Sequence, residues 1–431
     1  MTAAHFACEM GVAICVGFAN WGRRGYIKSS ALGAVSAQGT QALASFVVQI
    51  LVARTLGLEG LGIFALLYGV VVLTAAVVSG LIGDSLVVLN RYERGIRSAL
   101  QFLAVGTSAL LAAAVGAFCW ATGLISPFES VLLAVLVFAF CLEEVVRRVL
   151  MAHLAFWRVA VIDVIGLAVG LAVIGSVSLT GQVDLSSFFG AIACGQVCAL
   201  LAALPLLPAR ERYLVGWTTS GIREVLGYGS WRSLQQLLRP AMLTAVRSLV
   251  TLVAGLAATG MLEAARIYVA PVLLGIGGLS SYLFVSFSRD RSKPVRALVR
   301  RADRAVAVLL VGTLTLGVVA IAALPSIGAL LFGTSPELLA VAGWLCYSAS
   351  VAAVTPYGAL AATGGRQATV LAIRAMDTAV GVVAVGASLV SGIEVAAVPL
   401  VIAVSSLLGG IAIRMGILRP MRSADESEPK V

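Results

Sequence analysis

The chain has 431 residues, of which 60% are hydrophobic and only 12% are charged. A mean hydropathy of +1.03 is not that of a protein that folds in water around its own core. The net charge of +10 does not indicate nucleic-acid binding, because no basic patch is interleaved with aromatic residues on a soluble domain. The composition therefore predicts a polytopic membrane protein.

Residues 1–29 precede the first long apolar stretch. The run Phe6–Ala19 is short for a membrane span, and Glu9 interrupts it. A cleaved signal peptide fits less well, because the basic residues follow the apolar run when they should precede it. We interpret this segment as an interfacial helix or as the product of a wrongly chosen start codon.

From Ser30 onward, apolar stretches alternate with short connections marked by glycine, proline and charged residues. Each stretch is long enough to cross about 30 Å of hydrocarbon as a helix, and none has the alternation of a barrel strand. The predicted spans are 30–56, 61–83, 97–122, 128–148, 157–179, 185–207, 227–256, 260–286, 304–332, 336–361, 367–391 and 394–417.

An internal repeat divides these spans into two halves. Leu51–Tyr68 reads LVARTLGLEGLGIFALLY, and Leu252–Tyr268 reads LVAGLAATGMLEAARIY. Each contains a helix end, a tight turn and the start of a second helix, and such repeats are common in transporters. We predict an all-α protein with two pseudo-symmetric six-helix bundles around a central cavity. The predicted bundles are 30–208 and 227–418, joined by a cytoplasmic connector at 209–226 and followed by a disordered tail at 419–431.

Lysine and arginine are unevenly shared between the two ends of the predicted spans. On the side of the N-terminal segment lie all 30 of them except Arg54, Arg239, Arg247 and Arg266. This asymmetry predicts that both termini are cytoplasmic and that the chain lies in the inner or plasma membrane. The densest basic cluster, 289–304, is expected to contact anionic lipids.

Two of the predicted spans, 30–56 and 227–256, carry polar residues along one helical face. A polar side chain within hydrocarbon must face protein or a hydrated cavity. Helix packing explains the glutamines equally well, whereas arginines favour a cavity. Arg266 is spaced to pair with Glu263 and is otherwise a contact for an anionic substrate. The candidate cavity residues are Gln38, Gln41, Gln49, Arg232, Gln235, Gln236, Arg239, Arg247 and Arg266.

Asp163 and Asp377 occupy similar places in the two halves, five residues after Arg158 and three after Arg374. We interpret both as local ion pairs at the cytoplasmic rim and keep both as candidates for proton or sodium coupling. Seven scattered cysteines and two histidines predict neither a metal site nor a disulfide framework. No cofactor is predicted.

The segment ARTLGLEGLGIF, Ala53–Phe64, with twelve spans in two halves, resembles the multidrug/oligosaccharidyl-lipid/polysaccharide exporter superfamily. It is most similar to the polysaccharide-transporter branch, whose members flip lipid-linked sugars. The resemblance covers Ser30 to about Arg419 and implies two bundles that rock around a V-shaped cavity. Span 30–56 contains no acidic residue, which departs from the drug-exporting branch, and the lipid II flippases have two further helices.

These features favour a flippase that carries polyprenyl-phosphate-linked sugar or oligosaccharide to the outer leaflet for envelope polysaccharide assembly. Arg239 and Arg247 would bind the phosphate, and glycosyltransferases or a polymerase of the same pathway would be partners. The alternative is an ion-coupled exporter of amphiphilic drugs or metabolites, which needs a carboxylate in the cavity. An enzyme fits less well, because no sizeable aqueous loop presents catalytic carboxylates.

Overall fold

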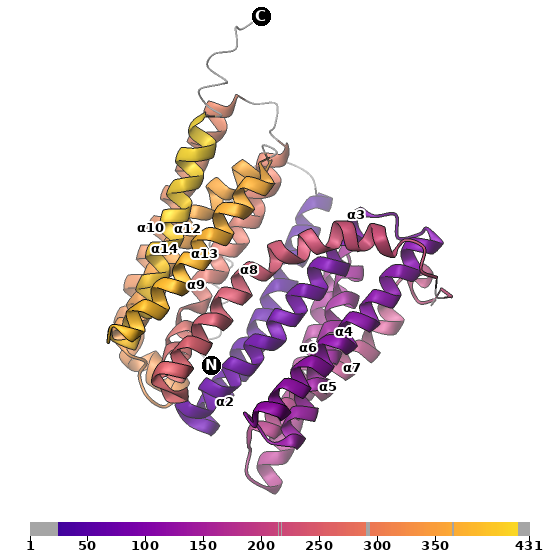
Figure 1. Cartoon of the computed structure of the whole chain (residues 1–431), viewed down its shortest axis with the longest axis horizontal. Coiled ribbons are helices and arrows are strands. Elements are labelled where there is room, and N and C mark those ends of the chain that lie inside the picture. The colour runs from indigo at the N-terminus through magenta and orange to yellow at the C-terminus, as the bar shows by residue number, and fades with distance from the viewer. Residues whose placement is uncertain (1–24, 214, 217, 290–293, 364–365, 421–431) are drawn as a thin grey trace, which may run out of the picture. The chain divides into compact units, whose positions relative to one another are not determined.

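Figure 1 shows the computed structural model of the chain, in which residues 25–213, 215–216, 218–289, 294–363 and 366–420 are described. These residues form helices and connecting turns, without a strand among them. The predictions for most of 1–29 and 419–431 lie outside the described residues. The principal helices are α2 (Gly25–Val78), α3 (Asp84–Val88), α4 (Arg94–Thr122), α5 (Pro127–Ala152), α6 (Phe156–Thr180), α7 (Leu185–Leu206), α8 (Ile222–Ala254), α9 (Leu256–Arg289), α10 (Val295–Ala323), α11 (Ala329–Phe332), α12 (Leu338–Thr363), α13 (Gln367–Val390) and α14 (Val398–Ile413).

Short π-helical or 3-10 turns adjoin several of these helices. They are η1 (Ser79–Gly83), η2 (Ala209–Glu211), η3 (Leu324–Gly328), η4 (Val395–Ala397) and η5 (Arg414–Leu418). Among the helix starts, α5 and α7 begin with capping boxes at Ser126 and Asp184. The Ser187 hydroxyl and backbone amide bond the carboxylate of Asp184 and hold its pKa below the ordinary value.

Ten helices among the described residues are long and apolar enough to cross a membrane. One of them, Ser36–Val88, would measure about 80 Å if straight and covers the first two predicted spans on either side of Gly57. Helix α5 carries Glu143, Glu144 and Arg147 and corresponds to the predicted span 128–148. Every predicted span coincides with a helix, so the predicted all-α membrane fold is confirmed.

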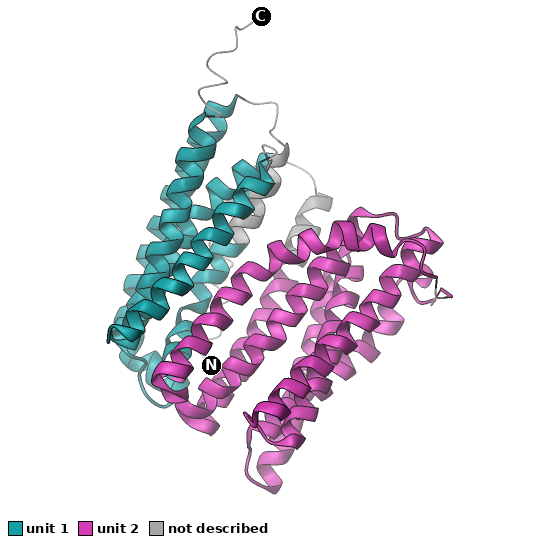
Figure 2. Ribbon diagram, viewed as in Figure 1, with its two compact units in different colours: residues 1–29, 261–431 teal, residues 30–260 magenta. Residues whose placement is uncertain are grey.

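The described residues form two compact units, shown in Figure 2. One comprises residues 30–260, which we call unit 2, and the other begins at Met261 and is called unit 1. Helix α8 belongs to unit 2, where it packs against η1. The boundary between the two units therefore comes after α8 in the chain, whereas the repeat in the sequence predicts a boundary at 209–226. The predicted pair of six-helix bundles stays a prediction.

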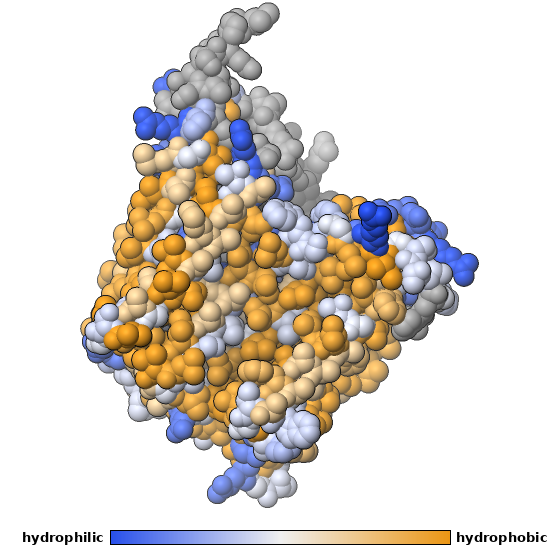
Figure 3. Space-filling model, in the orientation of Figure 1, coloured by the Kyte–Doolittle hydropathy of each residue, from blue (hydrophilic) through white to orange (hydrophobic). Residues whose placement is uncertain are grey.

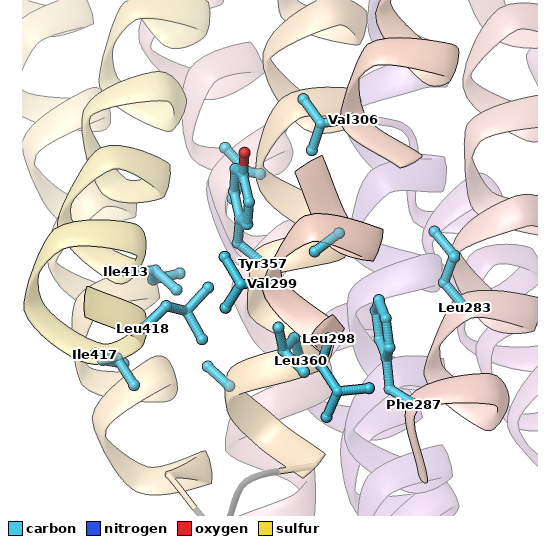
Figure 4. Packing of buried hydrophobic residues seen from close by; sticks show 13 residues of the cluster. Leu283, Phe287, Leu298, Val299, Val306, Tyr357, Leu360, Ile413, Ile417 and Leu418 are labelled. Atoms are coloured by element: carbon cyan, nitrogen blue, oxygen red, sulfur yellow. The ribbon is translucent and has the colours of Figure 1, made fainter. Parts of the chain in front are cut away.

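Within unit 1, buried apolar residues join α9 and α10 to α12, α14 and η5 (Figure 4). Phe287 and Leu298 pack with Leu360, while Ile413 and Ile417 close the cluster from the last helix. The outer surfaces are also apolar. In Figure 3 hydrophobic residues cover the helix flanks and hydrophilic residues gather toward the helix ends, as a lipid environment requires.

Two glycines of unit 2 form the turns of the repeated hairpins. Gly57 has φ 71° and ψ −168°, and Gly255 has φ 88° and ψ 175°. This backbone conformation is essentially restricted to glycine. The two sequences that resemble each other thus make the same turn, which explains why each hairpin carries a glycine there.

The two hairpins also touch each other reciprocally, at residues equally spaced from these turns. A Cβ on Gly62 would overlap the carbonyl oxygen of Leu256, and a Cβ on Gly260 would overlap that of Leu58. In each hairpin, one glycine therefore contacts the backbone of the other hairpin. The residue contacted is in each case the one that directly follows the turn glycine. A contact of this closeness has no space for any side chain.

We expect Gly62→Ala and Gly260→Ala each to destabilise the protein by about 1–3 kcal/mol, because the added methyl group meets fixed backbone. Thermal unfolding of the purified protein in detergent would measure the loss. The matched control is Gly175→Ala in α6, where a Cβ meets nothing within 4 Å. Equal melting temperatures for all three variants would contradict the backbone contact.

Candidate functional site

A cavity lies inside unit 2, lined by both halves of α2 and by helices α5, α6 and α7. Its volume, measured as the space that a water-sized molecule can occupy, is about 80 Å³, and it is partly open to the surroundings. Most of its wall is apolar, with the rings of Tyr68 and Phe140 packed edge to face at 6.2 Å. Its polar lining consists of Gln41, Ser45, Tyr68, Glu143, Arg147, Asp163 and Gln196.

A group of buried charges forms one side of this cavity. Arg147 is the largest fully buried side chain among the described residues. Its Nε lies 3.2 Å from Oδ1 of Asp163 and 3.6 Å from Oε1 of Glu143. Its Nη1 lies 3.2 Å from Oε2 of Glu144, so a single guanidinium serves three carboxylates. Unpaired charges would cost several kilocalories each at this depth, and the arrangement offsets that cost.

The sequence of α5 accounts for part of this geometry. Glu143 and Glu144 precede Arg147 and Arg148 by one helical turn, and both i, i+4 pairs are formed, as their spacing predicts. The third carboxylate comes from another helix. The hydroxyl of Thr40 in α2 donates to Oδ2 of Asp163 at 3.1 Å, so α2, α5 and α6 meet at this aspartate.

The local ion pair predicted between Arg158 and Asp163 is wrong. Arg158 instead donates to the carbonyl oxygen of Leu206 at 2.6 Å, and the partner of Asp163 is Arg147 of α5. A turn between α5 and α6 reverses the chain, and this brings the buried arginine beside the aspartate. Sequence spacing alone does not reveal a partner on a neighbouring helix.

For Asp377 the predicted local pair is confirmed. Nη1 of Arg374 lies 2.9 Å from Oδ2 of Asp377, and both residues belong to α13. Gly409 of α14 lies against the same carboxylate with no space for a Cβ. Asp377 therefore pairs within its own helix, whereas Asp163 joins a buried group on a cavity wall.

The glutamines of α2 have different roles, because the sequence allows both cavity lining and helix packing and the structure contains an example of each. Gln41 lines the cavity, as does Ser45. Gln49 is buried and donates to Ser45 Oγ at 2.7 Å, which is a packing role. Gln38 is exposed. Gln196 was not predicted, and its Oε1 is buried at the cavity without a hydrogen-bond donor among the described residues.

The polar stripe of α8 lies against α3 and η1. Nε of Arg232 donates to Oδ2 of Asp84 at 2.7 Å, and Nε2 of Gln236 donates to the same oxygen at 3.0 Å. Gln235 accepts from Arg232 at 2.6 Å. Asp84 is not among the residues predicted from the sequence, although an acidic residue directly after an apolar span is a signal that could have indicated it.

The remaining predicted arginines differ in their surroundings. Arg239 of α8 is exposed. The guanidinium of Arg247 lies against Gly69 of α2 and leaves no space there for a Cβ. Arg266 in unit 1 pairs with Glu263 at 2.7 Å, as their spacing predicts. These arginines and the stripe of α8 are not among the residues that line the cavity of unit 2.

Comparison with known proteins bears on the fold. An inward-facing multidrug-resistance MATE family transporter of the MOP superfamily matches with a TM-score of 0.70, at 14% identity over 93% of this chain and 100% of the other. The chain has the MATE transporter fold. An outward-facing MATE structure also matches, with a TM-score of 0.62 at 14% identity over 93% of this chain and 96% of the other.

A third MATE-fold neighbour is a MOP superfamily transporter from Pyrococcus furiosus, described as having a binding pocket of reverse polarity that suggests a different function. Its TM-score is 0.65, at 14% identity over 92% of this chain and 95% of the other. No protein-family model matches the sequence, and a search of curated proteins finds no match. The predicted polysaccharide branch stays a prediction.

We expect Arg147→Gln to destabilise this MATE-fold protein by about 3–5 kcal/mol, because three buried carboxylates would lose their shared counter-charge. Thermal unfolding in detergent would measure the change. Arg374→Gln is the control, and it should cost about 1 kcal/mol or less because that side chain is 34% exposed. Similar losses in the two variants would contradict the role of Arg147.

Proposed function

We propose that the protein is an ion-coupled membrane transporter that works by alternating access and moves an amphiphilic substrate. The observation that carries this proposal is the buried group of Glu143, Arg147 and Asp163 on the wall of a cavity. Ionisable residues at membrane depth are costly, and they mark ion or substrate pathways. Solved structures with this fold occur in inward-facing and outward-facing conformations, which supports alternating access.

In this proposal Asp163 is the coupling residue. A proton or a sodium ion at its carboxylate changes the charge that Arg147 faces, so the ion interacts differently with two conformations of unit 2. Such a difference is what a bound ion needs in order to shift a conformational equilibrium. The chemistry requires no covalent step, so the protein need not be an enzyme.

The lining of the cavity favours one class of substrate. The apolar wall with Tyr68 and Phe140 suits an aromatic or aliphatic body. The buried Oε1 of Gln196 suits a hydrogen-bond donor, and Glu143 and Asp163 suit a positive charge. These features favour the exporter of amphiphilic drugs or metabolites, which is the alternative that the sequence leaves open.

The lipid-linked sugar flippase is the second candidate, and the exposed Arg239 and the half-buried Arg247 of α8 favour it. A MOP superfamily transporter of this fold has a binding pocket of reverse polarity, which supports the view that the fold does not set the charge of the substrate. Arg232 and Gln236 contribute less to this candidate, because Asp84 already binds both. For this candidate, the substrate is a polyprenyl-phosphate-linked glycan, the partners are glycosyltransferases of the same pathway, and the location is the inner membrane.

For the exporter, we expect Asp163→Asn to abolish proton-driven or sodium-driven transport, because the coupling carboxylate is lost. Proteoliposomes containing the full chain would be assayed for ethidium movement under an imposed pH or sodium gradient. Asp377→Asn is the matched control, since its carboxylate pairs within α13, and it should retain most of the transport. Gradient-driven transport by Asp163→Asn at the rate of the unmodified protein would refute the coupling role.

For the flippase, we expect Arg239→Gln and Arg247→Gln each to lower translocation of a polyprenyl-diphosphate sugar about tenfold or more, since a charge-assisted phosphate contact contributes on the order of 1.5–3 kcal/mol. The measurement is enzymatic detection of the sugar at the outer surface of vesicles. Arg158→Gln is the control, because Arg158 bonds the carbonyl oxygen of Leu206 away from the cavity lining. Unaltered translocation in both variants would exclude this candidate.

A further inference from the structure

A series of alternating charges leads from the cavity of unit 2 to α8. It begins on α6, passes along the end of α5, reaches the first residue of α3 and ends about three turns inside α8. We call this series the relay. In order, its members are Asp163, Arg147, Glu144, Arg148, Asp84 and Arg232.

The cavity end of the relay centres on Arg147. Its Nη2 donates to Oδ2 of Asp163 at 3.4 Å, and its Nη1 donates to Oε2 of Glu144 at 3.2 Å. Glu143 faces the same guanidinium at 3.6 Å, and Thr40 donates to Asp163. Arg147 therefore divides its charge among three carboxylates, one of which leads onward.

The two carboxylate oxygens of Glu144 bond different arginines, so Glu144 connects Arg147 to Arg148. Oε2 accepts from Arg147, and Oε1 accepts from Nε of Arg148 at 2.8 Å. The aliphatic stem of Arg148 lies against Gly83, where a Cβ would be 2.7 Å from its Cγ. Its Nη1 reaches Oδ1 of Asp84 at 3.9 Å, the longest link of the relay.

The far end of the relay holds α8. Oδ2 of Asp84 accepts hydrogen bonds from Nε of Arg232 at 2.7 Å and from Nε2 of Gln236 at 3.0 Å. Gly80 of η1 lies directly on the backbone of Ser233, and Gly229 of α8 lies on the carbonyl of Leu81. The charges thus act where α8 crosses a π-helical turn at close range, and such turns are frequent at functional sites.

We infer that the charge state of Asp163 controls how tightly α8 is held against α3 and η1, and that the relay transmits this control. The inference rests on the coupling role proposed for Asp163. When a proton or cation neutralises Asp163, Arg147 loses one counter-charge and binds Glu144 more strongly. Each later link then changes in the opposite sense to the one before it. Arg148 moves its charge toward Asp84, and Asp84 holds Arg232 less tightly.

The test is amide hydrogen exchange of the full chain in lipid nanodiscs, followed in the first half of α8, residues 222–236. Asp163→Asn imitates the neutralised state, and we expect this segment to exchange about fivefold faster or more, the lower bound of ordinary site-to-site coupling. Arg148→Gln interrupts the relay. In its presence, Asp163→Asn should produce no further change in α8.

The matched control is Asp377→Asn, which removes a carboxylate that is paired within unit 1 and should leave α8 unchanged. A second variant serves if Asp163→Asn does not yield folded protein. Coupling between two sites is reciprocal, so Arg232→Gln at the far end of the relay should alter hydrogen exchange at 156–166 in α6. Unchanged exchange at the distant helix would overturn the inference, as would an equal response to Asp163→Asn with and without Arg148. These measurements need no transported substrate, so they and the transport assay can fail separately.

Discussion

The close approach of backbone to backbone is the constraint on which unit 2 depends. Gly62 and Gly260 bring the two repeated hairpins together, and Gly80 and Gly229 do the same where α8 crosses η1. In lipid the hydrophobic effect does not drive helices together, so close packing at small residues has to do so. These contacts place α8 in unit 2, and the ion pair of Arg232 with Asp84 depends on that placement.

Charge inside the unit follows a second constraint, namely that every buried ion needs a counter-ion. The side chain of Arg147 is only 2% exposed and is the positive partner that Glu143, Glu144 and Asp163 share, while Arg148 supplies a second positive charge beside Glu144. An apolar core of the same volume would be equally stable or more stable. A buried group of four charges is therefore poorly explained by packing alone, and its position on a cavity wall gives it a use.

The sequence predicted the fold well because the signals for it are local. Span length, charge asymmetry and the two similar hairpins depend on neighbouring residues. Most helices begin and end within about five residues of the predicted limits, although α10 begins at Val295 and its span was predicted to begin at 304. The break between the first two spans was also predictable, since Gly57 adopts a backbone conformation restricted to glycine. The packing of α8 with unit 2 was not, because it depends on which helices approach one another.

The candidate site shows the same limit more sharply. Asp163 and Asp377 look alike in sequence, each a few residues after an arginine, and the same local pair was predicted for both. Only Asp377 forms it. Asp163 lies beside α5, because the turn between α5 and α6 brings its carboxylate within 3.2 Å of the buried Arg147, and Arg158 bonds the carbonyl oxygen of Leu206 instead. Two residues equivalent in the repeat thus acquire different environments, because the carboxylate of Asp163 lies in a group that connects α2, α5 and α6, whereas that of Asp377 pairs with one arginine of its own helix.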